Sequence, residues 1–457
     1  MADVDEIARL SAVTLIEWYQ RERLSPMEVV NCLLDRAEHH RGLNALLATD
    51  PEQSRAEARQ ALKRHRNGTA RPLEGVPIVI KDLIDTAGLE TTYGSSIFAG
   101  HLPAEDATVV ARIRAAGGIV IGKATTHEFA WGITTDGTQA GPTCNPWDPS
   151  LVPGGSSGGS AAALAVGLAP LALGTDTAGS IRIPAAFCGV TGLRPTFAAV
   201  PTKGVFPLAP SLDCVGPLAR NVEDLELLLS VIAPDAAARK PESEVTVGLW
   251  ERSYQAPRTP ETAHVFDRAI AALKDAGVRI VSVDSGALPP LYATMATIIG
   301  AEAAAGHRRA GLWPAGRAAY HPGVRHRMEQ ATAIPFADYA QAQHDRMLVT
   351  SLAAHVLGQV DVLLTPVSGA PPAPIGHDAV PNAPEAVEFR EQVMAFTALQ
   401  SLTGVPACVV RAGFDGNGLP VGLQLTAAWG GDRTVLRTAR LLSDVLAEEQ
   451  HRWPDGA

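Results

Sequence analysis

The sequence contains little that would point to an extracellular protein, a metal site or a nucleic-acid partner. Its five cysteines are odd in number and form no C-x-x-C pair, which predicts reduced thiols in a cytoplasmic setting. The thirteen histidines include no H-E-x-x-H pattern, so we expect no metal ion. The formal net charge of −10 argues against nucleic acid and against an anionic membrane surface as partners.

Long apolar runs are also missing. The longest one, residues 161–173, is too short to span a membrane and is interrupted by Pro170. The first thirteen residues are acidic and lack the basic and apolar regions of a secretory signal. We therefore expect a cytoplasmic protein that acts on a small molecule, with a homodimer left open.

Lysine is scarce as well, since only six of the 38 basic residues are lysines. Lys81 and Lys123 differ from the others because each follows a short apolar run. Burial at such a position lowers the pKa of a lysine, because desolvation disfavours the charged amine. A neutral lysine can act as a general base, and position alone does not separate these two candidates.

With 46% hydrophobic and 19% charged residues, the 457-residue chain is typical of a globular protein with a large core. Short β-rich runs at residues 76–80, 119–121, 245–249 and 278–283 alternate with helical patterns. This alternation predicts an α/β fold, with a central mixed β-sheet flanked by α-helices on both faces. The pattern also predicts one continuous helix over residues 385–402.

The least ordinary composition lies in residues 154–160, where four glycines and three serines precede an apolar run. Glycine-rich backbone adopts conformations closed to residues with a Cβ, and a helix that follows such a loop points unpaired N–H groups into it. A second small-residue turn, residues 175–180, follows the next apolar segment. Two serine-bearing loops joined by one helix are typical of the two sides of an active site.

A serine in either loop could act as a nucleophile if a base removed its proton. The first loop lacks the lysine of the phosphate-binding G-x-x-x-x-G-K-[ST] motif, which disfavours a nucleotide site. It matches the G-x-S-x-G motif of a hydrolase nucleophile elbow twice, but no histidine follows at a predicted strand end. Ser180 could also be an ordinary helix N-cap. The residues alone leave these alternatives open.

Ten sequence blocks, taken in order, resemble the amidase signature family. They include GVPIVIKDLID at residues 75–85, GGSSGGSAAALAVG at 154–167, GTDTAGSIRIPAAFCGVTGLRPT at 174–196 and GLPVGLQL at 418–425. The resemblance extends from the N-terminal helices to about residue 445. It implies the amidase signature fold and a cofactor-free serine amidohydrolase that works through an acyl-enzyme.

The resemblance also implies the residues of a Ser–cisSer–Lys triad. The family's triad maps onto Ser180 as the nucleophile, Ser156 as the serine that follows a cis peptide bond, and Lys81 as the base. Lys81 then accepts a proton from Ser156 while Ser156 accepts one from Ser180. Lys123 becomes a structural residue at a strand end.

The oxyanion hole implied by the resemblance consists of the backbone N–H groups of Thr177, Ala178, Gly179 and Ser180. Ala178 stands where the family commonly has glycine. Ile183 stands where the glutaminase subunit of tRNA-dependent amidotransferases usually has glutamine. We keep that glutaminase role as an alternative function, together with a small ureido-acid hydrolase and a catalytically idle binding subunit on the same fold.

The substrate pocket is expected to involve residues 290–345, where the family varies most. The candidate lining residues are mainly aromatic or small, and they are Phe129, Ala130, Trp131, Gly132, Gly155, Trp313 and Tyr320. Such a lining favours a neutral, partly apolar or aromatic group in an amide, anilide, carbamate (urethane) or ester. A ureido acid would require a cationic group, which the sequence does not place.

We expect residues 1–457 to form a single amidase domain. Its four predicted parts are an N-terminal helical collar, a catalytic core, a partial cap over the substrate pocket and a return to the core. The collar comprises residues 1–66, the catalytic core 67–233, the partial cap 234–350 and the return to the core 351–457.

Overall fold

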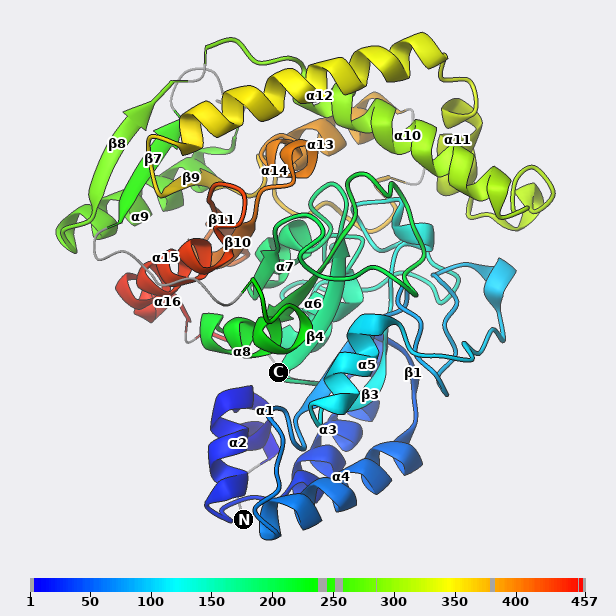
Figure 1. Cartoon of the computed structure of the whole chain (residues 1–457), viewed down its shortest axis with the longest axis vertical. Helices are drawn as coiled ribbons and strands as arrows, with labels where there is room; N and C mark the ends of the chain where they lie inside the picture. Colours follow the sequence, from blue (N-terminus) through cyan, green and yellow to red (C-terminus); the bar gives the residue numbers. More distant parts are fainter. Residues whose placement is uncertain are drawn as a thin grey trace.

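The computed structural model describes residues 4–236, 245–250, 258–284, 286–378, 383–450 and 452–454. These residues contain one eleven-stranded sheet (Figure 1). Its strands are β1 (Leu46–Thr49), β2 (Pro77–Lys81), β3 (Ile119–Ala124), β4 (Leu171–Asp176), β5 (Thr191–Arg194), β6 (Cys214–Ala219), β7 (Thr246–Trp250), β8 (Arg279–Val283), β9 (Val362–Pro366), β10 (Ala407–Phe414) and β11 (Pro420–Thr426).

The sheet is mixed, as predicted. Its strand order is β1-β3-β2-β4-β6-β5-β10-β11-β9-β7-β8. Strand β2 pairs in parallel with β3 and β4, and β7 pairs in parallel with β8 and β9. The other neighbours are antiparallel.

Helices cover both faces of this sheet. The α-helices are α1 (Val4–Arg9), α2 (Ala12–Gln20), α3 (Pro26–His39), α4 (Pro51–Arg66), α5 (Thr108–Ala115), α6 (Gly158–Ala165), α7 (Arg182–Cys188), α8 (Val222–Ile232), α9 (Pro260–Asp275), α10 (Leu291–Arg309), α11 (Pro322–Ala331), α12 (Phe336–Leu357), α13 (Pro384–Met394), α14 (Ala398–Thr403), α15 (Asp432–Val445) and α16 (Ala447–Gln450). Short 3-10 turns are η1 (Arg41–Leu43), η2 (Ser96–Phe98), η3 (Glu128–Ala130) and η4 (Arg317–Ala319).

The two faces of the sheet bury separate hydrophobic cores, because successive side chains of a strand point to opposite faces. In β2, Ile78 and Ile80 belong to the core shared with α5, α8, α9 and α15. Val79 belongs to the other core, which includes residues of α6, α7 and α10. Lys81 has the same parity as Val79, so the strand directs its side chain toward the α6 side.

Local sequence signals account for several helix starts. Helix α3 begins with a capping box, in which Ser25 Oγ accepts a hydrogen bond from Glu28 N and Glu28 Oε2 accepts one from Ser25 N at 2.8 Å. Pro26 occupies the first turn, where its missing N–H is not needed.

The segment predicted as a cap, residues 234–350, divides into two structural parts. Its first residues include 237–244, which lie outside the described residues. Strands β7 and β8 then extend the sheet. Neither these strands nor helix α9 contributes a residue to the cavity described below. Helices α10 and α11 line the cavity, and α12 packs against α10; all three lie at the opposite end of the long axis from α2 and α4 (Figure 1).

The prediction of one helix over residues 385–402 is wrong, because α13 ends at Met394 and α14 begins at Ala398. Tertiary hydrogen bonds hold two of the three residues between these helices. Thr397 Oγ1 donates to Ala178 O at 2.6 Å, and Gln424 Nε2 donates to Phe396 O at 2.6 Å. The break therefore links this helical segment to the loop that carries Ser180.

Candidate active site

Lys81 is the last residue of β2 and its side chain is completely buried. Its Nζ lies within hydrogen-bond distance of three hydroxyl groups, Ser156 Oγ at 2.8 Å, Ser157 Oγ at 2.9 Å and Thr175 Oγ1 at 2.8 Å. Burial lowers the pKa of Lys81 well below 10.5, and the charges of Asp176 and Asp213 oppose this shift only in part. The site therefore favours a neutral amine surrounded by hydroxyl groups.

Ser156 lies in the glycine-rich loop that precedes α6. The Gly155–Ser156 peptide bond is cis. Two groups hold the Ser156 carbonyl, since Thr126 Oγ1 donates to it at 3.0 Å and His127 N at 3.3 Å. The next residue connects this loop to the second one, because Ser157 N donates to Ser180 O at 3.1 Å. The two serine-bearing loops are thus in direct contact.

The second loop, residues 177–181, is organised around Asp176 at the end of β4. Asp176 Oδ1 accepts a hydrogen bond from Gly179 N at 2.9 Å, and Oδ2 accepts one from Ile181 N at 3.3 Å. Gly179 has a φ of 121°, and a Cβ at this position would come within 2.8 Å of the Thr397 side chain. The tight turn therefore requires glycine at residue 179.

Two buried arginines compensate the charge of Asp176. Arg182 Nε and Arg194 Nη1 each lie 3.0 Å from a carboxylate oxygen, and all three side chains are fully buried. Burial raises the pKa of Asp176, but the two guanidinium groups outweigh this effect and hold the pKa well below its ordinary range. The loop is thus fixed by an ionised carboxylate.

This arrangement corrects the predicted oxyanion set at one position. Gly179 N–H is already bonded to Asp176, so it is not available for an oxyanion. The cavity in front of the loop is lined by Thr177, Ala178 and Ser180, but not by Gly179. The backbone N–H groups of Thr177, Ala178 and Ser180 stay predicted donors, whereas that of Gly179 supports the turn.

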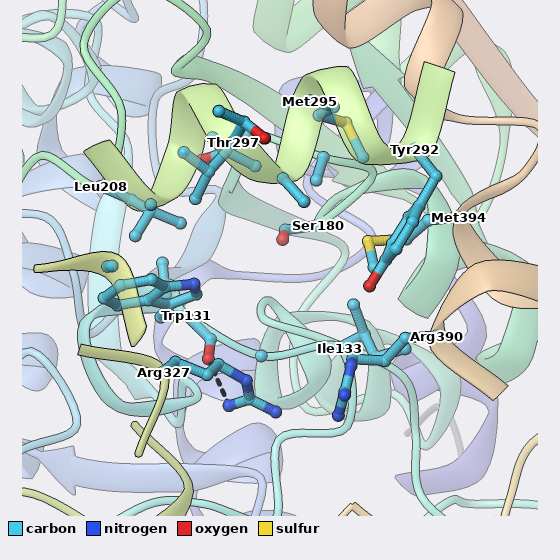
Figure 2. A pocket seen from close by; sticks show the side chains of 18 of the residues that line it. Trp131, Ile133, Ser180, Leu208, Tyr292, Met295, Thr297, Arg327, Arg390 and Met394 are labelled. Atoms are coloured by element: carbon cyan, nitrogen blue, oxygen red, sulfur yellow. Dashed lines mark hydrogen bonds between the residues drawn. The ribbon is translucent and has the colours of Figure 1, made fainter. Parts of the chain in front are cut away.

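Ser156 Oγ is hydrogen-bonded to Lys81 but not to the second serine, Ser180. Within the described part of the chain, no hydrogen bond joins Ser156 Oγ to Ser180 Oγ. The Ser180 side chain points into the cavity (Figure 2). Hydrogen bonds of an active site commonly tighten only when substrate binds, so this geometry is compatible with transfer between the two hydroxyls.

The cavity beside Ser180 has a volume of about 330 Å³ (Figure 2). Its walls come from the loop after η3, from the Ser180 loop, and from helices α10, α11 and α13. The lining residues are Ala130, Trp131, Gly132, Ile133, Thr177, Ala178, Ser180, Leu208, Tyr292, Met295, Ala296, Thr297, Ile299, Gly300, Arg327, Gln330, Ala331, Ile334, Arg390 and Met394.

Of the predicted lining residues, Ala130, Trp131 and Gly132 line this cavity, whereas Phe129, Gly155, Trp313 and Tyr320 do not. The three aromatic residues pack in the core instead. The Phe129 ring lies 4.9 Å from Phe206 and 5.4 Å from Tyr320, between ring centroids, and Trp313 lies 5.6 Å from Tyr320. Gly155 packs its backbone against Thr134, where a Cβ would come within 2.7 Å of the Thr134 nitrogen.

Sequence reasoning missed several lining residues that helices supply. Tyr292, Met295 and Ile299 are spaced by three and four residues along α10, and Arg390 and Met394 by four along α13. Such spacing places side chains on one helical face, which is a signal present in the sequence. It does not reveal whether that face meets a core or a cavity.

The second buried lysine has only structural contacts. Lys123 Nζ donates to Ile84 O and, at 3.0 Å, to Thr86 Oγ1. Burial lowers its pKa to about 8, and Asp82 opposes the shift. Lys123 does not line the cavity beside Ser180.

Glu128 joins the wall around Ala130 to the covering helices. Its Oε1 accepts a hydrogen bond from Ser95 Oγ at 2.6 Å, and its Oε2 accepts one from His321 N at 2.8 Å. Burial raises the pKa of this carboxyl to about 7, although both hydrogen bonds lower it. The folded protein therefore holds this proton more tightly than the unfolded chain does.

The raised pKa of Glu128 predicts a stability that depends on pH. Its contribution is fully present below the ordinary value of 4.5 and is lost as the pH rises through about 7. Between pH 4.5 and 7.5, we expect the unfolding free energy of the wild type to fall by about 3 kcal/mol relative to that of Glu128→Gln. Urea unfolding at several pH values measures both curves, and parallel curves would contradict the assignment.

Two further properties concern only the described residues. No helix among them is long and apolar enough to cross a membrane. No group of three or more histidine, cysteine, aspartate or glutamate side chains is arranged to hold a metal ion in this part of the chain.

Known proteins resemble this chain over nearly its whole length. The A subunit of a glutamyl-tRNA(Gln) amidotransferase from Thermus thermophilus is 36% identical, over 95% of this chain and 97% of the relative. A solved structure described as an amidase is 32% identical, with a TM-score of 0.87 over 96% of this chain and all of that one. The solved A subunit of the glutamyl-tRNA(Gln) amidotransferase from Thermotoga maritima is 29% identical, with a TM-score of 0.79 over 97% of this chain and 96% of that one.

The family model described as Amidase matches residues 28–436. This match covers far more than half of the chain and includes both serine-bearing loops, Lys81 and all the lining residues of the cavity. The chain therefore belongs to the amidase family, and it is an enzyme that hydrolyses carbon–nitrogen bonds.

Proposed function

We propose that this protein is a serine amidohydrolase in which Ser180 is the nucleophile, Ser156 relays the proton and Lys81 is the base. The observation that carries this proposal is the contact between the completely buried Lys81 Nζ and Ser156 Oγ at 2.8 Å, directly behind a cavity into which Ser180 points (Figure 2). A buried, neutral amine is the form of lysine that can accept a proton.

In the first step, Ser180 Oγ forms a bond to the acyl carbon of the substrate and loses its proton to Ser156 Oγ. Ser156 passes its own proton to Lys81 Nζ, so the charge of the base increases by one as the oxyanion forms. The proton then returns through Ser156 to the leaving nitrogen. The carbon–nitrogen bond breaks, and the amine leaves neutral with the acyl group held on Ser180.

The developing oxyanion is met by the backbone N–H groups of Thr177, Ala178 and Ser180. Donors of this kind contribute roughly 3–4 kcal/mol each when they are fixed before the reaction. The Asp176 cluster supports this fixation, because it holds Gly179 N and Ile181 N on either side of Ser180. Water then repeats the sequence on the acyl-enzyme and releases the acid.

The bond that is cleaved belongs to a carboxylic amide or a related acyl compound, such as an aryl amide, anilide, carbamate (urethane) or ester. The apolar part of the wall, including Trp131, Ile133 and Met295, supports a partly apolar group next to the reacting carbon. A small molecule is the substrate in this proposal. A cytoplasmic location and a homodimer stay predictions.

A second candidate is the glutaminase subunit of a tRNA-dependent amidotransferase. The name and the 36% identity of the Thermus thermophilus relative support it. Ile183, which replaces the glutamine usual at this position in that subunit, weighs against it. Release of ammonia from glutamine, measured beside the other amides, distinguishes the two candidates.

The proposal predicts covalent labelling of one residue. A fluorophosphonate probe is expected to add to the wild-type protein once, as measured by intact mass, because the activated Ser180 hydroxyl attacks phosphorus. Ser180→Ala should remain unlabelled, whereas Ser150→Ala, which changes an exposed serine outside the cavity, should label like the wild type. A wild-type protein that resists the probe would favour the idle binding subunit.

A further inference from the structure

Asp213 is a carboxylate beside the active site that takes no part in the proton transfers proposed above. It directly precedes β6, and the antiparallel register of β4 and β6 pairs Asp176 with Cys214. One step further along both chains brings Thr177 opposite Asp213. Thr177 Oγ1 donates a hydrogen bond to Asp213 Oδ1 at 2.6 Å. Asp213 is thus linked directly to the loop that carries Ser180.

Backbone groups of the cavity wall hold the same carboxylate. Leu208, which lines the cavity (Figure 2), donates from its N to Asp213 Oδ2 at 3.0 Å. Ala209 N lies 3.2 Å from Oδ1 and 3.1 Å from Oδ2. Burial raises the pKa of Asp213, and the hydrogen bonds from all three donors lower it. Because a carboxylate only accepts hydrogen bonds, these contacts favour its ionised form.

Asp213 also lies close to the hydroxyl groups around Lys81. Thr175 and Thr177 are two residues apart at the end of β4, so their side chains share one face of the sheet at a spacing of about 7 Å. Thr175 Oγ1 contacts Lys81 Nζ at 2.8 Å, whereas Thr177 Oγ1 contacts Asp213. Thr175, Thr177 and Asp213 together line a second cavity of about 150 Å³. The carboxylate is therefore near enough to the amine for an electrostatic interaction.

Asp213 differs from the neighbouring Asp176 in its charge balance. Asp176 is paired with both Arg182 and Arg194. Among the described residues, no basic side chain forms an ion pair with Asp213. Arg194 lies nearby, but its guanidinium donates to Asp176 and to a backbone carbonyl. The charge of Asp213 raises the pKa of Lys81, against the larger effect of burial.

The other ionisable groups near this pair do not supply a partner for Asp213. Burial raises the pKa of Cys214 to about 11 and holds the pKa of His127 well below 6.5, so both side chains are neutral near pH 7. Glu302 of α10 carries a like charge, which raises the pKa of Asp213. The cation beside Glu302 is Arg346 of α12.

We propose that Asp213 is a positioning residue for acylation, which orients Thr177 beside the oxyanion and favours transfer of the proton to Lys81. This inference rests on the proposed function. As Ser180 attacks the acyl carbon, the proton that reaches Lys81 makes it cationic, and the nearby carboxylate stabilises that cation. No proton passes to Asp213 itself. Its hydrogen bond to the Thr177 hydroxyl holds a residue whose backbone N–H is a proposed oxyanion donor.

The rate at which a fluorophosphonate labels Ser180, measured from pH 5 to pH 10, tests the electrostatic part without a known substrate. The second-order rate constant should rise with pH as Lys81 becomes neutral, and the midpoint of the rise reports the pKa of this lysine in the free protein. Asp213→Asn removes a negative charge that favours the protonated amine. We therefore expect the midpoint to fall by about one pH unit and the plateau by about 10-fold, because the base is weaker.

Asp432→Asn is the matched control for this variant. Asp432 is a buried carboxylate that accepts hydrogen bonds from Thr196 N at 2.8 Å and from Thr196 Oγ1 at 2.5 Å, and it lines neither cavity. We expect this variant to keep the midpoint and the plateau of the wild type. Should Asp213→Asn fail to fold, Asp213→Ser removes the same charge and carries the same expectation.

Two variants of Thr177 test the orienting part. Thr177→Val removes the hydrogen bond and leaves the charge of Asp213 in place. We expect the plateau to fall about 10-fold while the midpoint stays within about 0.3 pH units of the wild type. Thr177→Ser retains the hydroxyl group and should be labelled at nearly the wild-type rate.

The outcomes separate this inference from the proposed function. A wild-type protein that is labelled at Ser180, together with an unchanged midpoint in folded Asp213→Asn, overturns the inference and leaves the function intact. Labelling of Thr177→Val at the wild-type rate overturns it too. Failure of the wild type to be labelled contradicts the proposed function itself.

Discussion

Replacing Lys81 by methionine is expected to lower kcat by about 10⁴-fold, because it removes the proposed base and with it the shared hydrogen-bond partner of three hydroxyl groups. The substitution keeps most of the side-chain volume, so packing is altered little. Amide hydrolysis under single-turnover conditions measures the acylation step directly. Folding of the variant is checked by urea unfolding.

Lys123→Met provides a matched control for this experiment. Lys123 is equally buried and lies on β3, the parallel neighbour of β2, but its contacts are with Ile84 and Thr86. We expect Lys123→Met to lose stability and to keep kcat within a few-fold of the wild type. Similar activity in the two variants would contradict the assignment of Lys81 as base.

The same assignment predicts the sign of the pH dependence. Only the neutral form of Lys81 accepts a proton, so kcat/KM rises with pH as this lysine loses its own proton. Burial places the pKa well below 10.5, and the rise is therefore complete far below that pH. An activity that still increases steeply around pH 10 would show that Lys81 is solvated, contrary to the structure.

The second large effect concerns stability. Asp176→Asn is expected to lower the unfolding free energy by about 3–5 kcal/mol, because it leaves Arg182 and Arg194 charged and uncompensated in a fully buried site. The neighbouring polar side chains cannot replace the lost charge, although Gln400 and Gln424 accept hydrogen bonds from Arg182. Chemical denaturation of the variant measures the loss.

Two comparisons make the Asp176 result interpretable. Glu223→Gln breaks the pair with Arg440, whose side chains are about half exposed, and we expect a loss below about 1 kcal/mol. Adding Arg194→Met to Asp176→Asn removes one uncompensated charge and should recover part of the stability. A loss below about 1 kcal/mol in Asp176→Asn alone would contradict the role of this ion cluster.

The sequence was sufficient for features that depend on local pattern. The alternation of strands and helices predicted the mixed α/β sheet, and the apolar run before Lys81 predicted its burial. The residues alone did not separate Lys81 from Lys123, because each lies at or next to the end of a buried strand, and the two strands are parallel neighbours. The structure separates them by their hydrogen-bond partners. Lys81 Nζ contacts Ser156 Oγ, whereas Lys123 Nζ contacts the backbone carbonyl of Ile84.

Features that depend on distant contacts were not predictable in this way. The segment predicted as one helix, residues 385–402, contains no glycine or proline that would mark the end of α13 at Met394. The two residues that follow are held by distant partners, since Thr397 donates to Ala178 O and Phe396 O accepts from Gln424. Phe129, Trp313 and Tyr320 have the character of pocket residues but pack on one another. Arg327 and Arg390 have the character of ordinary surface residues, and only the fold brings them to Asp378.

The walls of the cavity have a consequence for how such an enzyme can diversify. The groups proposed for bond cleavage lie between residues 81 and 180, whereas much of the opposite wall comes from α10 and α11, more than a hundred residues later. Mutations in that later stretch can accumulate without disturbing the Lys81 and Asp176 clusters. Proteins with this fold can thus change their substrate preference while the residues proposed for bond cleavage stay the same.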